Sequence, residues 1–328
     1  MRISILSAAH VHFDLFATAI RACADTQLVA IYDDQPIRGK EKAEQYGVPF
    51  MAALEDALDQ CEAVVVCSEN AKHEEMVLAA LEANKHVLCE KPLSTTGKSA
   101  EKMASKADER NLVLATAFPM RFNSPAIEMK KALAGNKIGE ILAFHGTNQG
   151  KCPGDWFVKP HLAGGGAVMD HTVHLVDLMR WYTGAEIAKV YAEIDSFLHA
   201  QYDIDDVGHI QLLFSNGVIA DLDPSWSRPA GYPTWGGLGL RVTGTKGVMD
   251  LNGFAQTISV YTSDSVYWEY WGESEYAYMI EGFVKRIGGE ETSLASAWDG
   301  VAAVKVVEAA YLSAREKEFV PLYGKMEG

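Results

Sequence analysis

Short apolar runs alternate with longer amphipathic stretches over the first 118 residues. Five apolar runs have the length of one β-strand each: residues 3–6, 28–32, 63–67, 86–89 and 112–115. Helices are expected between them: an apolar-periodic stretch over 13–20, a polar helix around 41–46, and longer helices over about 72–83 and 97–110. The run at 63–67 is apolar throughout, as in a strand covered on both faces. This order of elements predicts an α/β domain with a parallel, doubly wound sheet.

The pattern changes after about residue 120. A helix is expected over 125–133, and longer strands are expected at 140–149, 187–197, 208–214, 218–226, 240–243, 257–261 and 266–271. Further helices are expected at 171–182, 276–287 and 297–315. Asn216-Gly217 lies between apolar runs and is a strong hairpin signal, and Thr245-Lys246-Gly247 is a second candidate turn. We therefore predict two domains, residues 1–120 and an α+β domain over 121–328 with a large, mainly antiparallel open sheet.

Composition and charge exclude several classes of protein. The chain has 328 residues, of which 48% are hydrophobic, and this suits large buried cores. No apolar run approaches the roughly 20 residues of a membrane span, and the N-terminus reads as a strand and not as a signal peptide. Five cysteines at unrelated spacings form neither a disulfide framework nor a zinc motif, so we expect reduced thiols and a cytoplasmic protein. The net charge of −15 argues against nucleic acid and anionic membranes as partners.

Candidate chemistry gathers in two polar clusters. Cys89-Glu90-Lys91-Pro92 places a lysine just after a strand of the predicted parallel sheet, where such sheets form a ligand crevice. Gly164-Gly165-Gly166 precedes Asp170 and His174, which stand four residues apart on one face of a helix. A cation, a candidate base and a carboxylate to orient that base are the groups needed to move a proton off a hydroxyl. The two clusters therefore indicate an enzyme.

The first turn between strand and helix gives mixed evidence for a dinucleotide. It reads Ser7-Ala8-Ala9-His10-Val11-His12, where such folds carry G-x-G-x-x-G. Small residues at Ser7 and Ala9 allow close backbone approach, and a helix N-terminus favours a phosphate. His12, at the third glycine position, either donates to a phosphate or obstructs packing, and a turn without any ligand stays open as an alternative. Asp33, at the end of the second strand, suits the ribose of NAD and would repel the 2′-phosphate of NADP.

These residues resemble the Gfo/Idh/MocA oxidoreductases, the group that contains glucose-fructose oxidoreductase and inositol dehydrogenases, over essentially the full length. The matching positions are Ser68-Glu69-Asn70, His73, Glu90-Lys91-Pro92, Arg121-Phe122, Gly139-Glu140-Ile141, Trp156, Gly164-Gly165-Gly166, Asp170 and His174, and the ending from Trp298-Asp299-Gly300 through Ala309-Ala310-Tyr311, Ser313 and Val320. The resemblance implies an N-terminal Rossmann domain that binds NAD or NADP, and a C-terminal domain whose open sheet often mediates oligomerisation. The glycine-free first turn departs from the family pattern.

The resemblance also implies roles for individual residues. Lys91, Asp170 and His174 would be catalytic: His174 would accept the proton of a substrate hydroxyl, Asp170 would orient its imidazole, and Lys91 would bond the reacting oxygen. Cofactor contacts are expected from Ser7, Ala9, His10, Val11, His12, Asp33, Ser68, Asn70, His73, Glu90, Lys91 and Arg121. Substrate contacts are expected from Lys91, Trp156, Asp170, His171 and His174.

Each residue also has an ordinary structural interpretation. Lys91 is compatible with a surface lysine, Asp170 with a helix cap and His174 with a hydrogen-bonded core histidine, but their joint occurrence at family spacing favours catalysis. Trp156 either stacks on a sugar ring or packs in the core. His171 and His174 lie three residues apart, yet the surrounding acidic residues do not converge on them, so we expect no metal site.

We therefore expect an NAD(P)-dependent dehydrogenase of a secondary hydroxyl group in a sugar, glycoside or cyclic polyol. NAD is the expected cofactor, with NADP possible, and we expect a homo-oligomer, dimer or tetramer, through the C-terminal sheet. Two alternatives stay open: a non-catalytic regulator that binds a ligand with the same fold, and a reductase of an imine or small carbonyl.

Overall fold

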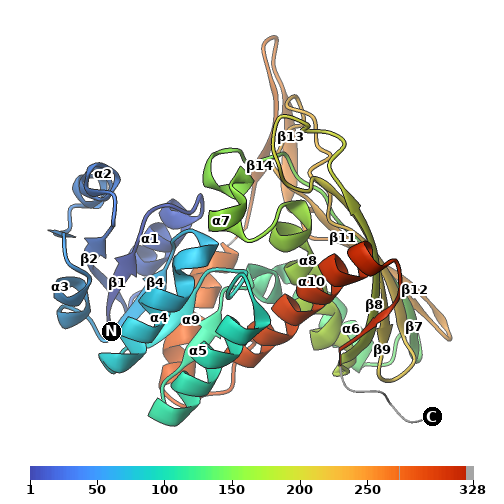
Figure 1. Cartoon of the computed structure of the whole chain (residues 1–328), viewed down its shortest axis with the longest axis horizontal. Coiled ribbons are helices and arrows are strands. Elements are labelled where there is room, and N and C mark those ends of the chain that lie inside the picture. The colour runs from blue at the N-terminus through green and yellow to red at the C-terminus, as the bar shows by residue number, and fades with distance from the viewer. Residues whose placement is uncertain (273, 323–328) are drawn as a thin grey trace. The chain divides into compact units, whose positions relative to one another are not determined.

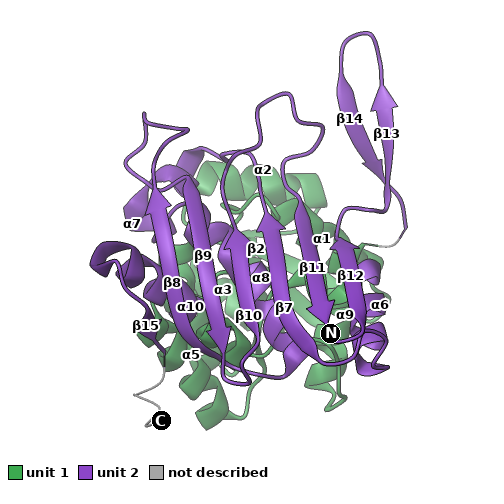
Figure 2. Cartoon of the chain, turned by 90° about the vertical axis from the view of Figure 1, so that its right-hand side faces the viewer, with its two compact units in different colours: residues 1–122, 273–302 green, residues 123–272, 303–328 purple. Residues whose placement is uncertain are grey.

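The computed structural model describes residues 1–272 and 274–322, which divide into two compact units. The first unit contains Met1–Phe122 together with residues 273–302, and the second contains Asn123–Gly272 and the remainder of the chain (Figure 2). The first segment ends close to the predicted boundary at residue 120. Residues 273–302, however, were assigned to the second domain from the sequence, whereas the structure groups them with the first unit.

Six parallel strands form the sheet of the first unit, in the order β3-β2-β1-β4-β5-β6. Their bounds are β1 (Arg2–Leu6), β2 (Gln27–Tyr32), β3 (Phe50–Met51), β4 (Ala63–Val66), β5 (His86–Cys89) and β6 (Leu114–Thr116) (Figure 1). The strand order reverses between β1 and β4, where sheets of this kind bind ligands beyond the carboxyl ends of their strands. The predicted parallel, doubly wound sheet is confirmed, and the short strand β3 adds one strand that the pattern did not predict.

Helices connect these strands, and their apolar faces cover the sheet. They are α1 (Phe13–Ala22), α2 (Pro36–Tyr46), α3 (Leu54–Asp59), α4 (His73–Glu82) and α5 (Gly97–Arg110), and α9 (Glu275–Ile287) joins them from a later part of the chain. Two short 3₁₀ segments, η1 (Asn70–Lys72) and η2 (Pro119–Phe122), follow strands β4 and β6. Helix α2 begins earlier than predicted because Pro36 stands at its first turn, where a missing N–H costs nothing. Helix α3 was not predicted.

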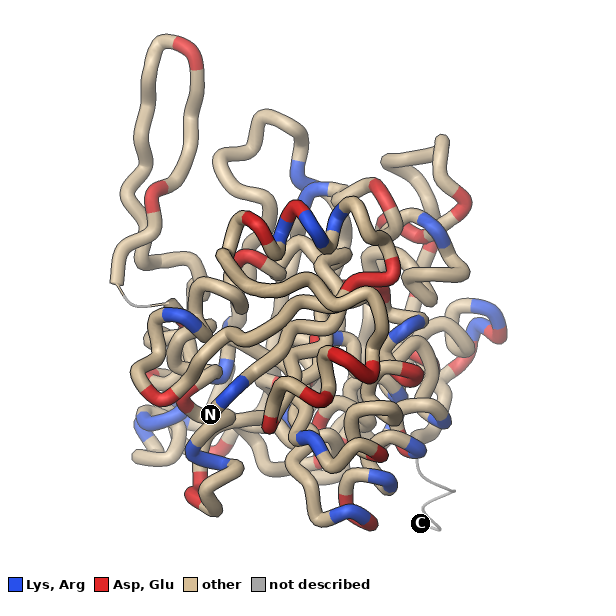
Figure 3. The backbone as a smooth tube through the Cα atoms, turned by 90° about the vertical axis from the view of Figure 1, so that its left-hand side faces the viewer, with Lys and Arg blue, Asp and Glu red and all other residues tan. Residues whose placement is uncertain are grey.

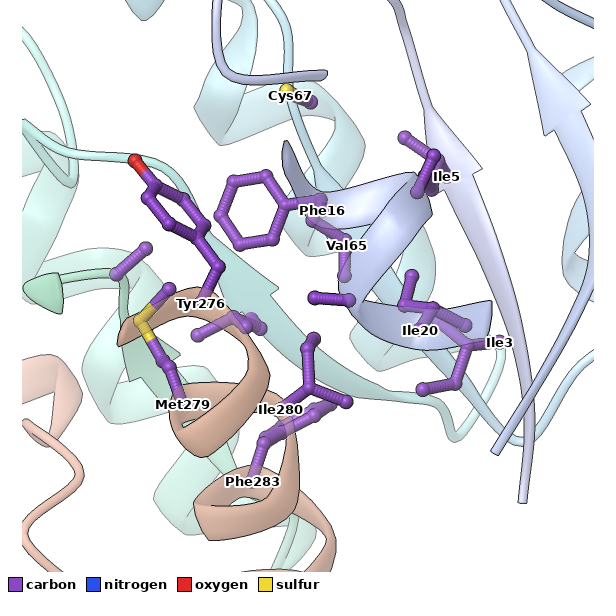
Figure 4. Packing of buried hydrophobic residues seen from close by; sticks show 14 of the residues in the cluster. Ile3, Ile5, Phe16, Ile20, Val65, Cys67, Tyr276, Met279, Ile280 and Phe283 are labelled. Carbon is purple, nitrogen blue, oxygen red and sulfur yellow. The ribbon is translucent and has the colours of Figure 1, made fainter. Parts of the chain in front are cut away.

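Helix α9 completes the core of the first unit. Its residues Tyr276, Met279, Ile280 and Phe283 pack with the buried side chains of α1 and the sheet (Figure 4). Met279, Ile280 and Phe283 are fully buried, each with 0% of its surface exposed. Burying these side chains is the main free-energy gain of the helix. Residues 273–302 are therefore part of the first unit's core although they follow the second unit in sequence.

Seven strands form the sheet of the second unit, in the order β12-β11-β7-β10-β9-β8-β15. They are β7 (Ile141–Asn148), β8 (Ile187–Asp195), β9 (Val207–Phe214), β10 (Ile219–Asp223), β11 (Leu238–Gly244), β12 (Gly247–Asn252) and β15 (Val320–Pro321). The pair β7 and β10 is parallel and the other pairs are antiparallel, which confirms the predicted sheet. Asn216-Gly217 forms the predicted hairpin turn between β9 and β10, with Gly217 at φ 85°.

Helix α8 (Ala167–Thr183) packs on β7, β9 and β10 and begins four residues before the predicted start at 171. The unit also contains α6 (Ser124–Ala134), η3 (Asp155–Val158), α7 (Pro160–Ala163) and most of α10 (Ala297–Glu316). The opposite face of the sheet is not covered by helices (Figure 2) and exposes apolar residues such as Ile219, which is 57% exposed. Strands β13 (Thr257–Tyr261) and β14 (Val266–Tyr270) form a separate hairpin. None of the described helices is long and apolar enough to cross a membrane.

The role of α9 in the first unit is testable with two neighbouring residues. We expect Ile280→Ala to lower the free energy of unfolding by about 2–5 kcal/mol, because it leaves a cavity in a fully buried site. Glu281→Ala, at the adjacent exposed position, should change it by about 0.5 kcal/mol or less. Urea unfolding of both variants provides the measurement, and equal values would contradict the assignment of α9 to this core.

Candidate active site

The first turn keeps the backbone shape of a dinucleotide-binding turn without its glycines. Ser7 has φ 70°, in the left-handed region that normally favours glycine. Its amide donates to the carbonyl oxygen of Tyr32 at 2.6 Å, and its hydroxyl accepts the N–H of Ala9 at 3.3 Å. These bonds hold a serine where the sequence pattern calls for the first glycine. Ala8 is buried and Ala9 is half-buried, and contact of this turn with a phosphate at the start of α1 stays a prediction.

Asp33 is engaged by groups of its own unit. Its Oδ2 accepts the N–H of Ala8 at 2.7 Å and Nε of Arg38 at 2.8 Å. Its Oδ1 accepts the N–H of Gln35 at 2.7 Å and Nη2 of Arg38 at 2.7 Å. The side chain of Asp33 is fully buried, whereas that of Arg38 is 29% exposed. The carboxylate therefore fixes the first turn and carries a bidentate arginine that reaches the surface.

His12 turns inward at the position of the third glycine. Its Nδ1 lies 2.8 Å from Oε1 of Glu90, and the residue is only 6% exposed. His10 lies against it, with Nδ1 accepting the backbone N–H of His12 at 3.2 Å. In this arrangement the imidazole of His12 ties the first turn to the Glu90-Lys91-Pro92 segment. The predicted obstruction of packing does not arise, because the ring occupies a polar site beside Glu90.

Glu90 joins this pair of histidines to Lys91. Its second oxygen, Oε2, accepts the backbone N–H of Lys91 at 2.9 Å. Burial alone would raise the pKa of the Glu90 carboxyl, but the neighbouring His10, His12 and Lys91 side chains and the bond from His12 hold its pKa well below the usual range. Glu90 is therefore an ionised carboxylate inside the unit, and it positions the backbone of the candidate catalytic lysine.

Among the described residues, His10, His12 and Glu90 also form a group whose potential metal-ligating atoms lie within 4.8 Å of one another. The 2.8 Å between His12 Nδ1 and Glu90 Oε1 is a hydrogen-bond length. Ligands of a tetrahedral zinc ion stand about 3.3 Å apart when each is about 2.05 Å from the metal. Hydrogen bonding accounts for the cluster, and the absence of a metal requirement stays a prediction.

The other predicted cofactor residues of this unit lie after β4 and β6. His73 is fully buried; its Nδ1 faces the carbonyl oxygen of Pro92 at 3.0 Å and its Nε2 that of Ser68 at 3.3 Å. Burial lowers the pKa of His73, so the neutral ring is favoured. Asn70 is buried within η1, and Arg121 forms an ion pair with Asp299 at 3.3 Å. His73 therefore links the two turns that follow β4 and β5. A cofactor contact from any of these residues stays a prediction.

In the second unit, Asp170 and His174 lie on the buried face of α8, with 6% and 8% of their surfaces exposed. Oδ2 of Asp170 lies 3.2 Å from Nε2 of His171 and accepts the indole N–H of Trp226 at 3.4 Å. Trp226, which follows β10, is almost completely buried. The carboxylate is thus held by an adjacent residue of its own helix and by a tryptophan from the sheet.

His171 and Trp156, predicted to contact substrate, are packed inside the unit. His171 is 2% exposed; its Nδ1 faces the carbonyl oxygen of Pro224 at 3.0 Å, and its backbone oxygen accepts Nδ2 of Asn148 at 2.9 Å. Trp156 is 3% exposed and stacks on Phe157 with ring centroids 3.8 Å apart. Both residues support the site from within the unit, and direct substrate contact stays a prediction for each.

Sequence reasoning missed several supporting residues. Trp226 was recognised only as the end of a strand, and the bond of His12 to Glu90 was not foreseen. The bond of Trp226 to Asp170 joins residues 56 positions apart, and only the fold brings them together. The His12–Glu90 bond joins residues 78 positions apart, for which the sequence contains no local signal.

Comparisons with known proteins agree with this geometry. Residues 5–118 match the family described as "Oxidoreductase family, NAD-binding Rossmann fold", and residues 126–250 match the "GFO/IDH/MocA C-terminal domain". Myo-inositol 2-dehydrogenase of Thermotoga maritima is 28% identical, over 98% of this chain and 98% of its own. 1,5-anhydro-D-fructose reductase of Ensifer adhaerens is 30% identical, over 70% of this chain and 69% of its own.

A similar fold is seen in the crystal structure of GenD2 from gentamicin A biosynthesis in complex with NAD. It superposes with a TM-score of 0.90 at 26% identity and covers 99% of this chain and 97% of that one. The family matches and this structure confirm the expected family and the two-part fold. They also confirm an NAD-binding Rossmann domain, although its first turn contains no glycine.

The charge network around Glu90 generates a prediction about stability and pH. We expect Glu90→Gln to lower the free energy of unfolding by about 2–3 kcal/mol at pH 7, because it removes a buried charge with several partners. The folded pKa of Glu90 is depressed, so this contribution is complete above the unfolded pKa of about 4.3 and is lost as the pH falls toward the folded pKa. The difference in the free energy of unfolding between the wild type and Glu90→Gln should shrink by about 1.4 kcal/mol for each pH unit below about 4.3.

Denaturant unfolding between pH 7 and pH 3 measures this difference. Glu41→Gln is the control, because Glu41 is an exposed residue of α2 and its replacement should change the free energy of unfolding little at any pH. A difference for Glu90→Gln that stays constant down to pH 3 would contradict the depressed pKa.

Proposed function

Because the chain belongs to the Gfo/Idh/MocA family of NAD-binding oxidoreductases, we propose that it interconverts a secondary alcohol and a ketone on a sugar, glycoside or cyclic polyol. Support comes from two relatives whose names give ring-shaped polyhydroxylated substrates. One is named for an inositol and the other for an anhydrofructose. The single observation that carries the proposal is the pair Asp170 and His174 on the buried face of α8, with the carboxylate held by Trp226.

Oxidation of an alcohol breaks one C–H and one O–H bond and forms the C=O double bond. Bound NAD supplies the acceptor for the hydrogen and electron pair that leave carbon. His174 accepts the hydroxyl proton as general base. Asp170 stabilises the positive charge that then develops on the imidazole. Lys91, which follows Glu90 in the first unit, donates to the reacting oxygen as its negative charge increases.

The residues of the first unit fit the cofactor. The left-handed backbone at Ser7 and the small side chains of Ala8 and Ala9 would admit the pyrophosphate at the start of α1. Arg38, held by Asp33 and partly exposed, would lie toward the adenosine ribose at the end of β2.

We further propose that the substrate is an uncharged or cationic small molecule and that the protein forms a homo-oligomer. Basic and acidic residues are interspersed along the backbone (Figure 3). The acidic residues outnumber the basic ones, and the resulting net charge of −15 disfavours anionic partners. The uncovered face of the second unit's sheet exposes Ile219 and Val248, which lie in one cross-strand row with Ala143 and Thr243, and this supports its use as an interface.

A regulator that binds a ligand without turnover is the second candidate, favoured by the glycine-free turn and by an Asp33 carboxylate that already accepts four N–H groups of its own unit. The two candidates differ in turnover. A screen of inositols and sugars with NAD⁺, followed by the absorbance of reduced nicotinamide, tests the proposed function directly. No turnover with any of them, alongside measurable NAD binding, would favour the regulator.

His174→Ala tests the assignment of the base. We expect turnover to fall on the order of a hundredfold or more, because the general base is lost, while the dissociation constant of NAD stays within about twofold. His209→Ala, at an exposed position of β9, is the matched control and should keep wild-type turnover. Near-wild-type turnover in His174→Ala, on a substrate that the wild type oxidises, would refute the assignment.

Asp33→Ala tests the adenosine end of the cofactor site. The change removes a carboxylate and frees the guanidinium of Arg38 to pair with a 2′-phosphate, so the preference for NAD over NADP should narrow by about tenfold or more. Asp59→Ala, an exposed position at the end of α3, is the control. Titration of each variant with both cofactors gives the ratio, and a ratio equal to that of the wild type would remove Asp33 and Arg38 from the ribose site.

A further inference from the structure

Helix α8, which carries Asp170 and His174, begins without a cap of its own. Its N-cap residue is Gly166, which has no side chain to accept the first backbone N–H groups. Asp205 supplies these acceptors from another part of the unit. Its Oδ1 accepts the N–H of Gly166 at 2.8 Å, its Oδ2 that of Val168 at 2.9 Å, and its backbone oxygen that of Ala167 at 3.0 Å.

Tyr311, on α10, fixes this capping carboxylate. Its hydroxyl donates to Oδ1 of Asp205 at 2.8 Å. Asp205 therefore joins the first turn of α8 to a helix that lies more than a hundred positions away in sequence. The negative charge of Asp205 also lies at the positive end of the α8 dipole, which favours the arrangement further.

Glycines stand where the start of α8 approaches its neighbours most closely. A Cβ atom on Gly165 would lie 2.2 Å from the hydroxyl oxygen of Tyr311, and one on Gly166 would lie 1.9 Å from the backbone oxygen of Asp205. A Cβ on Gly208, at the start of β9, would lie 2.5 Å from Cγ2 of Val168. These distances leave no room for any side chain. Gly165 and Gly166 therefore allow α8 to begin directly against Asp205 and Tyr311.

The neighbouring residue, Asp206, supports the other side of Asp170. It is fully buried, and its carboxylate accepts the backbone N–H groups of residues 197, 198 and 199. Its backbone oxygen accepts the N–H of Trp226 at 2.8 Å, and the indole of Trp226 bonds Asp170. Two consecutive aspartates are thus connected to Asp170 through different hydrogen bonds. Asp205 binds the start of helix α8, and Asp206 binds Trp226, whose indole contacts Asp170.

We propose that Asp205 and Tyr311 are positioning residues that set the placement of Asp170 and His174. The inference rests on the proposed function, because it assigns the two residues to the same reaction. The connection is direct: the carbonyl oxygen of Gly166 accepts the N–H of Asp170 at 3.0 Å, so a shift of Gly166 is passed to Asp170 within one turn. A displacement of about 1 Å in a catalytic group lowers the rate by up to about a hundredfold.

A role in stability alone makes a different prediction. It would lower the melting temperature of the variants but leave kcat unchanged in assays well below that temperature. A positioning role lowers kcat under the same conditions, with little change in the KM of the substrate or in the dissociation constant of NAD, whose predicted contacts lie in the first unit.

The experiment compares two variants with two matched controls in the full chain. Asp205→Asn keeps the shape of the side chain but turns one acceptor into a donor that faces an N–H group. Tyr311→Phe removes only the hydroxyl. Asp203→Asn changes an exposed aspartate of the same loop, and Tyr191→Phe removes another tyrosine hydroxyl that donates to a carboxylate, that of Glu193 on the exposed part of β8.

Two measurements are made on each variant: steady-state kinetics with a substrate that the wild type oxidises, and hydrogen exchange of the segment 164–170. We expect Asp205→Asn to lower kcat by about tenfold or more and Tyr311→Phe by a smaller factor, with KM within about threefold. Hydrogen exchange of the first amides of α8 should become faster in both variants, and more so in Asp205→Asn than in Tyr311→Phe. Both controls should match the wild type.

Wild-type kcat in Asp205→Asn and Tyr311→Phe, with faster exchange or a lower melting temperature, would overturn the inference and leave a purely structural contact. Loss of kcat in the controls to the same extent would overturn it as well. If Asp205→Asn does not fold, Tyr311→Phe decides between these results. The substrate screen with the wild type separates the two proposals. No turnover of any inositol or sugar refutes the proposed function, whereas wild-type turnover together with an unchanged kcat in Asp205→Asn and Tyr311→Phe refutes only the positioning role.

Discussion

Backbone N–H groups at the start of a helix or in a tight turn have no acceptor within their own element, and burying them unpaired costs free energy. In this protein carboxylates accept these groups at the turns that carry candidate functional residues. Asp33 and Asp205 come from elsewhere in the same unit, whereas Glu90 directly precedes the residue that it binds. Asp33 accepts the N–H of Ala8 in the first turn, Glu90 that of Lys91, and Asp205 those of Gly166 and Val168. The placement of the candidate chemistry therefore depends on a few internal acidic residues.

Internal carboxylates require compensation for their charge, because moving an ion out of water is costly. Each of these three carboxylates is compensated by different groups. Arg38 pairs with Asp33 through two hydrogen bonds, His10 and His12 lie beside Glu90, and Asp205 combines a tyrosine hydroxyl with the dipole of α8. The acidic residues behind the net charge of −15 are thus of two kinds. Some face solvent, and others accept hydrogen bonds from buried backbone N–H groups.

Hydrophobic periodicity was sufficient to predict most elements of both units, because burial on one face imposes a period of about 3.6 or 2 on the sequence. It failed where burial is slight, as for the two-residue strand β3 and the short helix α3. It also could not place α9, because an apolar helix face indicates a core but not which one. Lys91, Asp170 and His174 were singled out from the sequence, whereas Trp226 and Asp205 were given no role and Tyr311 was noted only as part of the family pattern. Their contribution depends on hydrogen bonds between distant segments, and no local pattern encodes these.

The first turn shows how a fold keeps its geometry when its characteristic residues are replaced. Glycine serves such a turn in two ways, by allowing positive φ and by leaving space for a phosphate or a neighbouring strand. Ser7 provides the first property, because its backbone and hydroxyl bonds hold it at φ 70°. His12, the N-cap residue of α1, stands at the third glycine position, and its side chain is accommodated beside Glu90. The replacement therefore couples the cofactor turn to the segment of Lys91, a connection that a glycine at position 12 has no atoms to make.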